Sequence, residues 1–240
     1  MLEVSNIVVI DLECAKSADD CRYCGLENVE PLHLAGCCRG VAYAGDRFTP
    51  LGWDNTAALG LCIGCYWSYT DSRIHWFDTP SLETTMRHLV EMQPLIVSFN
   101  GIGFDGPLML EVLTADLLDH EPRWKDFPHG LAQAWADMWA RSYDLLAEIW
   151  TLDPVNKYRR GLNSLDAISQ ASGLGAKLSH GAQAPRDWRD GRYADVLNYC
   201  QDDVYKTKEL FEMVCRGKPL IRGNGEPVYL PKPTLFHEVV

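Results

Sequence analysis

The 240-residue chain predicts an α/β fold: a mixed sheet, with three antiparallel strands followed by parallel strands, flanked by helices. Two observations lead to this prediction. In the first half, two strand-like runs are joined by a short turn, which indicates a hairpin. In the second half, an apolar run alternates with stretches of helical periodicity, as in β–α units. A cysteine-rich segment, residues 15–57, interrupts the pattern after the first strand and is interpreted as an insertion.

The first half of the chain supplies the antiparallel strands. Residues 6–10 form a short β-branched run that suits a buried strand. Residues 59–69 and 73–77 are mostly apolar or aromatic and flank a polar turn, which predicts the hairpin. Thr79 and Pro80 then predict the start of a helix, with Thr79 as its N-cap.

The second half supplies the β–α units. The apolar run at residues 94–99 suits a strand buried on both faces of a parallel sheet. A glycine-rich turn leads from it into a helix at about residues 107–118. The remaining expected elements are a helix at about residues 130–140, a strand at 143–150, a short helix from Asn163 or Ser164 to Gly173, and a long helix at about 192–216.

Composition limits the class of protein. The chain is 47% apolar and 23% charged, which is ordinary for a folded soluble domain. It has no apolar run near the ~18 residues of a membrane span, and its N-terminus lacks the basic region of a signal peptide. Nine cysteines without a secretion signal favour a reducing, cytoplasmic location over a disulfide framework.

Charge bears on the type of partner. The net charge of −11 is unusual for a protein that binds nucleic acid tightly, because phosphate contacts normally supply much of that affinity. Residues 157–192, however, hold seven basic side chains and three acidic ones. This segment is either a solvated surface or a loop that contacts phosphates. The acidic balance predicts weak, salt-sensitive binding unless a partner holds the substrate.

Four acidic residues and one tyrosine form the most informative pattern. Asp11 and Glu13 are two positions apart on a predicted strand and therefore point to one face of the sheet. Tyr199 and Asp203 are four positions apart on a predicted helix and are therefore neighbours. Asp105 lies between a predicted strand and helix, where active sites of α/β sheets gather. We expect these segments to meet at one edge of the sheet.

Crowded carboxylates need a cation. Four of them would repel one another, and some would be forced to take up protons unless a divalent ion compensated their charge. An all-oxygen set favours Mg²⁺ or Mn²⁺ over zinc. Two such ions can activate a water and neutralise the leaving oxygen of a phosphodiester, and a tyrosine hydroxyl can orient that water. Each fragment alone is common in proteins, but together they predict a two-metal phosphodiester hydrolase.

At these residues the chain resembles the DEDD 3′→5′ exonucleases of the ribonuclease H-like fold, in their tyrosine (DEDDy) subtype. It is most similar to stand-alone enzymes that resemble the proofreading domain of family-B DNA polymerases. The histidine subtype is excluded, because position 198 is Asn. The resemblance covers about residues 5–14 and 58–216. The matching residues are Asp11 and Glu13 in the first motif, Asn100, Phe104 and Asp105 in the second, and Tyr199 and Asp203 in the third.

The resemblance implies a role for each of the five catalytic candidates. Asp11, Glu13 and Asp203 would ligate the tighter metal ion, and Asp11 would bridge to a second. Asp105 would act on the second ion through water, and Tyr199 would position the nucleophile. The implied cofactors are two Mg²⁺ or Mn²⁺ ions.

The resemblance also implies a substrate with a free 3′ end, and single-stranded DNA is favoured. Asn100 and Phe104 would line the path of the terminal nucleotides. A proofreading role would need a replication or repair partner, since the chain has no room for a polymerase. Three alternatives stay open: a 3′ exoribonuclease, a catalytically silent nucleic-acid or protein-binding module, and an integrase-like or ribonuclease H-like endonuclease, which would not require Tyr199.

The insertion carries a second candidate metal site. A Cys-x₂-Cys pair there, with a histidine and a further cysteine, could hold a structural Zn²⁺ ion. Cys62 and Cys65 have the same spacing but lie in a predicted strand, and they are interpreted as small core residues. The candidate zinc ligands are Cys21, Cys24, His33 and either Cys37 or Cys38.

The predicted domain organisation is simple. Residues 1–217 form one exonuclease domain that includes the insertion, and residues 218–240 form a C-terminal extension. The extension contains four prolines and is either a terminal hairpin or a tail that docks a partner.

Overall fold

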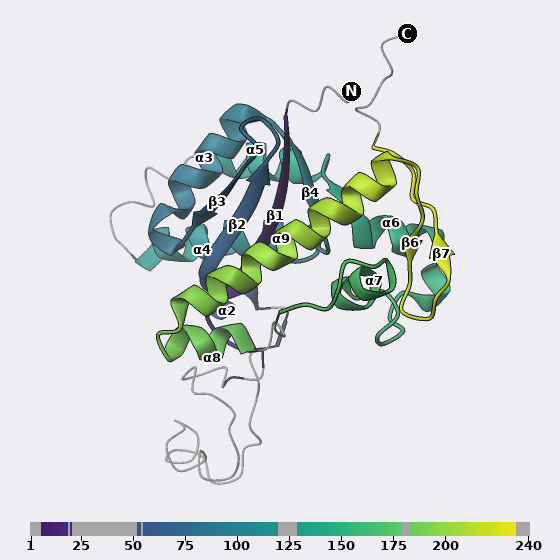
Figure 1. The fold of residues 1–240 in the computed structure, drawn as a ribbon. Coiled ribbons are helices and arrows are strands. Elements are labelled where there is room, and N and C mark those ends of the chain that lie inside the picture. The colour runs from purple at the N-terminus through teal and green to yellow at the C-terminus, as the bar shows by residue number, and fades with distance from the viewer. Residues whose placement is uncertain are drawn as a thin grey trace.

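A five-stranded mixed sheet of order β3-β2-β1-β4-β5 lies at the centre of the computed structural model (Figure 1). β1 pairs antiparallel with β2 and parallel with β4, so the predicted fold class is confirmed. The structure describes residues 6–18, 20, 52–53, 55–119, 129–178 and 183–233. The strands are β1 (Ile7–Cys14), β2 (Leu61–Ser68), β3 (Arg73–Phe77), β4 (Leu95–Ser98) and β5 (Tyr143–Asp144).

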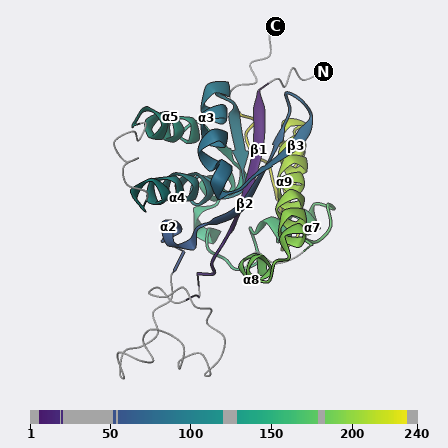
Figure 2. The same ribbon diagram turned by 90° about the vertical axis from the view of Figure 1, so that its left-hand side faces the viewer.

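Helices cover both faces of this sheet (Figure 2). The face packed against α3, α4 and α5 is called the closed face below, and the face crossed by α9 is called the α9 face. None of the described helices is long and apolar enough to cross a membrane. The helices are α2 (Thr56–Leu59), α3 (Leu82–Met92), α4 (Asp105–Asp119), α5 (His129–Trp139), α6 (Leu145–Leu152), α7 (Leu165–Ala171), α8 (Ala184–Arg189) and α9 (Tyr193–Cys215).

Strand β1 is buried on both faces. Because side chains alternate along a strand, its even-numbered residues join the core of the closed face and its odd-numbered residues begin the core of the α9 face. Ile7 and Val9 are apolar members of the α9-face core, and Asp11 and Glu13 follow them in the same row. Two carboxylates therefore stand where apolar side chains would continue the core.

The parallel strands β1, β4 and β5 end at the same edge of the sheet. After β4 the chain turns sharply, and Asn100 adopts a left-handed backbone conformation with φ of 74°. The buried Asp144 side chain holds this turn by accepting hydrogen bonds from the backbone N–H groups of Asn100 (2.9 Å) and Ile102 (3.0 Å). Gly106 is required at the start of α4, because a Cβ there would lie 2.6 Å from the Trp139 ring. The second motif is thus firmly fixed at this edge.

Two expectations about secondary structure were wrong, and the helix α8 was missed. The strand expected at residues 143–150 ends at Asp144, whose carboxylate also caps α6 through the N–H groups of Leu146 and Ala147. Thr79 is not an N-cap: Asp78 caps a short 3₁₀ helix (Thr79–Ser81) before α3, and the Thr79 hydroxyl donates to the Leu61 carbonyl. The six-residue helix α8 was not expected, because it is too short to show a period.

The beginning of the C-terminal extension is a hairpin docked on the domain. β6 (Leu220–Ile221) pairs antiparallel with β7 (Pro227–Val228), and Leu220, Val228 and Leu230 join the core of the α9 face. Arg222 forms an ion pair with Asp153 at 2.6 Å. The hairpin alternative is therefore correct for residues 220–230.

The insertion is described only at its two ends. The backbone N–H of Lys16 donates to the Leu59 carbonyl (2.9 Å), and that of Gly52 donates to the Ala18 carbonyl (2.9 Å). Cys62 and Cys65 are buried in the core, as predicted. The candidate zinc ligands Cys21, Cys24, His33, Cys37 and Cys38 lie outside the described residues, so the zinc site stays a prediction.

Candidate active site

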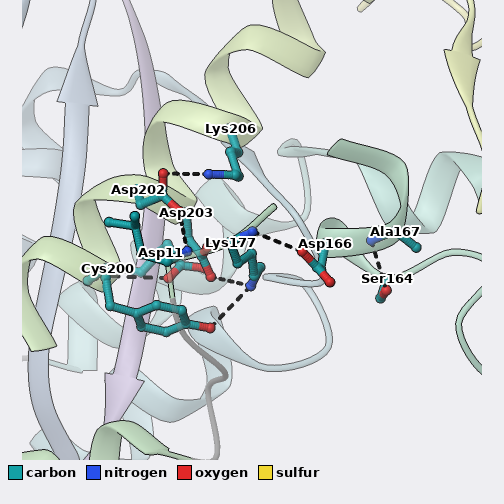
Figure 3. A network of polar contacts seen from close by, with 11 residues as sticks. Asp11, Ser164, Asp166, Ala167, Lys177, Cys200, Asp202, Asp203 and Lys206 are labelled. Carbon is teal, nitrogen blue, oxygen red and sulfur yellow. Dashed lines mark hydrogen bonds and ion pairs between the residues drawn. The ribbon is translucent and has the colours of Figure 1, made fainter. Parts of the chain in front are cut away.

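Three carboxylates converge where β1 runs beneath α9. Asp11, Glu13 and Asp203 each place one carboxylate oxygen within 4.8 Å of those of the other two. Glu13 and Asp203 are buried, and Asp11 is half-buried. Figure 3 shows Asp11 and Asp203 pointing toward each other from the strand and the helix. The predicted meeting of the first and third motifs is present in the fold.

Asp105 approaches this cluster from the second motif. It is buried at the first residue of α4, and its negative charge raises the pKa of both Asp11 and Glu13. Among the described residues it is not part of the tight three-carboxylate group. The four acidic candidates thus interact electrostatically, but Asp105 lies farther from the other three than they lie from one another.

The electrostatics of the cluster are unfavourable without a cation. Burial raises the pKa of Asp11 and of Glu13 well above their usual values, and the neighbouring carboxylates, with Asp203 foremost, raise them further. Burial also raises the pKa of Asp105, and Asp144 adds to the shift. In the described part of the protein, Oδ1 of Asp203 is buried and accepts no hydrogen bond. An oxygen-only donor set with a buried, unsatisfied oxygen fits a hard divalent cation.

Lys177 lies next to Asp203, on the side that faces Asp166 (Figure 3). Its ammonium forms an ion pair with Oδ2 of Asp203 and donates to the Tyr199 hydroxyl oxygen at 3.2 Å. Burial opposes its charge, but Asp203 and Asp11 outweigh that effect and the pKa of Lys177 is raised. Its backbone N–H donates to Oδ1 of Asp166 (2.9 Å), which fixes the loop that carries it. Sequence reasoning counted Lys177 only as one of seven basic residues.

Tyr199 faces the same cluster from one turn before Asp203 on α9. Its ring is buried, and burial followed by the charge of Asp203 holds the pKa of its hydroxyl well above the ordinary value. The phenol therefore stays protonated at neutral pH and can donate a hydrogen bond. The spacing that predicted a shared helix face for Tyr199 and Asp203 is confirmed.

A cavity of about 160 Å³ opens beside these groups. Asp11, Glu13, Phe104, Tyr199 and Asp203 are among the residues that line it. Asn100, the other residue expected along the substrate path, is not among its lining residues. The structure thus brings five of the seven motif residues to one cavity, and Asp105, like Asn100, is not among the residues that line it.

Two cysteine thiols support the backbone that carries the carboxylates. The Cys62 thiol donates to the carbonyl of Glu13 (3.1 Å), and the Cys200 thiol donates to the carbonyl of Asp11 (3.4 Å). Burial raises the pKa of both thiols, so they stay protonated and remain donors. Their positions carry no sequence signal beyond an apolar helical or strand pattern.

Comparisons with known proteins find similarity both to a family model and to solved structures. A family model described as "Predicted 3'-5' exonuclease related to the exonuclease domain of PolB" matches residues 78–219, which include the second and third motifs. The fold is similar to that of the family B DNA polymerase from the hyperthermophilic archaeon Pyrobaculum calidifontis, with a TM-score of 0.50 and 14% identity. That likeness covers 88% of this chain and 24% of the polymerase chain. No curated protein matches the chain significantly.

Proposed function

Since the chain belongs to the family of predicted 3′-5′ exonucleases related to the exonuclease domain of PolB, we propose that it removes nucleotides from the 3′ end of single-stranded nucleic acid. The observation that carries the proposal is the convergence of Asp11, Glu13 and Asp203 beside a protonated Tyr199. A surface that only bound a partner would gain nothing from burying mutually repelling carboxylates. This argument favours an enzyme over a silent binding module on the same fold.

The proposed cofactors are two Mg²⁺ or Mn²⁺ ions. Asp11, Glu13 and Asp203 would hold one, with Asp11 shared, and Asp105 would act on the second through water. When bound, such ions supply an activated water and neutralise charge on the phosphate. The raised pKa values of Asp11 and Glu13 and the unsatisfied Oδ1 of Asp203 support this fit.

The chain's own groups would orient the reactants. The Tyr199 O–H donates a hydrogen bond that positions the attacking water in the cavity. The Lys177 ammonium offsets part of the negative charge of Asp203 and Asp11 before the substrate arrives. The Phe104 ring supplies an apolar surface for a terminal base. Asn100, held in its turn by Asp144, would support the path of the terminal nucleotides.

DNA is the favoured substrate, because the family is described by its relation to a DNA polymerase domain. RNA is the alternative, and the choice depends on how the cavity meets a 2′-hydroxyl. The net charge of −11 supports a partner that holds the substrate, such as a replication or repair protein. The odd number of cysteines, nine, supports a reducing, cytoplasmic location over a disulfide framework.

The decisive experiment uses end-labelled substrates. Single-stranded DNA and RNA labelled at the 5′ or the 3′ end are incubated with Mg²⁺ or Mn²⁺, beside an Asp11→Ala variant. We expect a descending ladder from 5′-labelled DNA, and immediate release of the label from 3′-labelled DNA, by the wild-type protein only. Faster loss of RNA would identify an exoribonuclease, and cutting of a circular strand would identify an endonuclease. No degradation of any substrate would refute the enzymatic proposal.

A further inference from the structure

Trp53 is a large aromatic side chain held at the surface beside the acidic cluster. It is 64% exposed, and its ring lies edge-to-face against Phe104 with the ring centroids 5.8 Å apart. Both rings line the cavity that contains Asp11 and Tyr199. Trp53 lies outside residues 78–219, which match the family model, and outside all three motifs.

The backbone beside Trp53 is tied to the end of β1. The N–H of its neighbour Gly52 donates to the Ala18 carbonyl at 2.9 Å, four residues after β1 ends. Two positions beyond Ala18, the Asp20 carboxylate is buried, accepts from the Ser17 N–H (2.8 Å) and pairs with Arg189 of α8 (2.9 Å). The first residues of the insertion are thereby attached to α8, and the backbone next to Trp53 is attached to those residues.

The cavity lining therefore combines two chemically different kinds of side chain. The carboxylates of Asp11, Glu13 and Asp203 line it together with the apolar side chains of Trp53, Phe104 and Pro185. A terminal nucleotide has the same division, with a charged phosphate joined to an apolar base. Aromatic stacking tolerates any base and needs no positive charge, so it suits a protein whose net charge of −11 disfavours phosphate contacts.

We propose that Trp53 is a base-stacking residue, which together with Phe104 holds the 3′-terminal base while the acidic cluster receives the adjacent phosphate. This inference rests on the proposed exonuclease function and adds the residue that recognises a base-bearing strand end. It also gives the insertion a role at the active site, because Trp53 is supplied from its distal end. Substrate binding would then depend on the base and only weakly on its identity.

The test measures stacking directly. Single-stranded DNA with 2-aminopurine at its 3′ terminus is titrated with protein in Ca²⁺, and quenching of the fluorescent base is recorded. The variants are Trp53→Ala, Trp53→Phe and Tyr229→Ala; Tyr229 is a matched control, since it is 66% exposed and lies beside β7. We expect quenching by the wild type, Trp53→Phe and Tyr229→Ala, and its loss in Trp53→Ala.

The kinetic arm compares intact and abasic 3′ ends in Mg²⁺. Trp53→Ala should raise KM for intact single-stranded DNA on the order of ten-fold, because stacking of one base is worth that much, with little change in kcat. It should leave cleavage of the abasic end unchanged, whereas a general loss of folding would slow both substrates. Retention of activity by Trp53→Phe keeps the test valid if the alanine variant is unstable.

The outcomes separate the two proposals. Wild-type quenching and KM in Trp53→Ala would overturn the stacking role while leaving the exonuclease intact. An equal loss on intact and abasic ends would also overturn it, because the effect would then not depend on the base. Quenching that requires Trp53 in a protein without any nuclease activity would refute the proposed function but support the binding site.

Discussion

The two faces of strand β1 are both buried but carry different side chains. Toward the closed face, Val8, Ile10 and Leu12 are all apolar and pack under α3, α4 and α5. Toward the α9 face the row begins with Ile7 and Val9 and then changes to carboxylates. The pairing of β1 with β2 continues through this change from Val8 to Glu13, and its register shifts only between Glu13 and Cys14.

The two faces differ in the free-energy cost of burial, which is high on the α9 face because charged groups are buried there. Burying a charged group without a partner is unfavourable, and the raised pKa values of Asp11 and Glu13 express that cost. The closed face has no such burden: Met86, Leu89 and Leu108 on its helices are fully buried among apolar neighbours. We therefore expect changes on the closed face to alter stability, and changes on the α9 face to alter activity.

The largest expected effect is on the acidic side. Asp203→Asn should lower kcat roughly a thousand-fold or more, because a metal-ligand carboxylate supports several kcal/mol of transition-state stabilisation. Its neighbour Asp202 is the matched control: it pairs with Lys206 at 2.5 Å and accepts from the Leu178 N–H, outside the three-carboxylate group. Asp202→Asn should change kcat only within roughly five-fold, because the Asp202 carboxylate lies outside the three-carboxylate group.

Single-turnover cleavage of 5′-labelled DNA measures both variants, with circular dichroism to verify folding. Equal losses in Asp203→Asn and Asp202→Asn would show that the helix face, and not the acidic cluster, matters. Such a result would contradict the claim that the carboxylates on the α9 face of β1 determine activity.

The sequence allowed the closed face and most of the acidic cluster to be predicted, for one physical reason. Alternation along a strand and four-residue spacing along a helix fix which side chains share a face. Asp11 and Glu13 lie on one such element and Tyr199 and Asp203 on another, so the shared face of each pair followed from spacing, and their meeting at one edge was expected from the order and context of the motifs. The prediction of a strand at residues 143–150 was wrong beyond Asp144, because a short apolar run fits a strand or a helix equally well.

Residues supplied by irregular segments could not be predicted in this way. Lys177 and Trp53 come from loops, where no period relates position in the chain to direction in space. Asp144 holds the second motif through two backbone hydrogen bonds that span more than 40 positions in sequence. Charge balance was the one usable signal: a buried acidic cluster needs a cation, and Lys177 is the cation that the chain itself provides.

A core substitution on the closed face should have a smaller and different effect. Leu89→Ala on α3 removes a fully buried side chain and should cost about 2–5 kcal/mol of unfolding free energy. Urea denaturation measures this loss, and kcat of the folded protein should remain close to wild type. A large fall in kcat at temperatures where the variant is folded would show that the two faces are coupled.

The smallest effect concerns the acidic cluster without metal. In the folded protein, burial and then the carboxylates of Asp203, Asp105 and Glu13 raise the pKa of Asp11, and Lys177 lowers it only partly. A carboxyl with a raised folded-state pKa contributes stability that is complete below its unfolded value of about 3.9 and is lost as pH rises through the folded value. Metal-free Asp11→Asn should therefore be more stable than wild type near neutral pH.

Each unit of pKa displacement corresponds to about 1.4 kcal/mol, and each kcal/mol to about 2–4 °C in Tm for a chain of this size. Thermal unfolding in EDTA should show Asp11→Asn above wild type at pH 8, with the difference shrinking toward pH 4. Added Mg²⁺ or Mn²⁺ should raise Tm of the wild type and not of Asp11→Asn. A difference in Tm that does not change with pH would mean that burying the Asp11 carboxylate has no electrostatic cost. The α9 face and the closed face would then not differ in the electrostatic cost of burial.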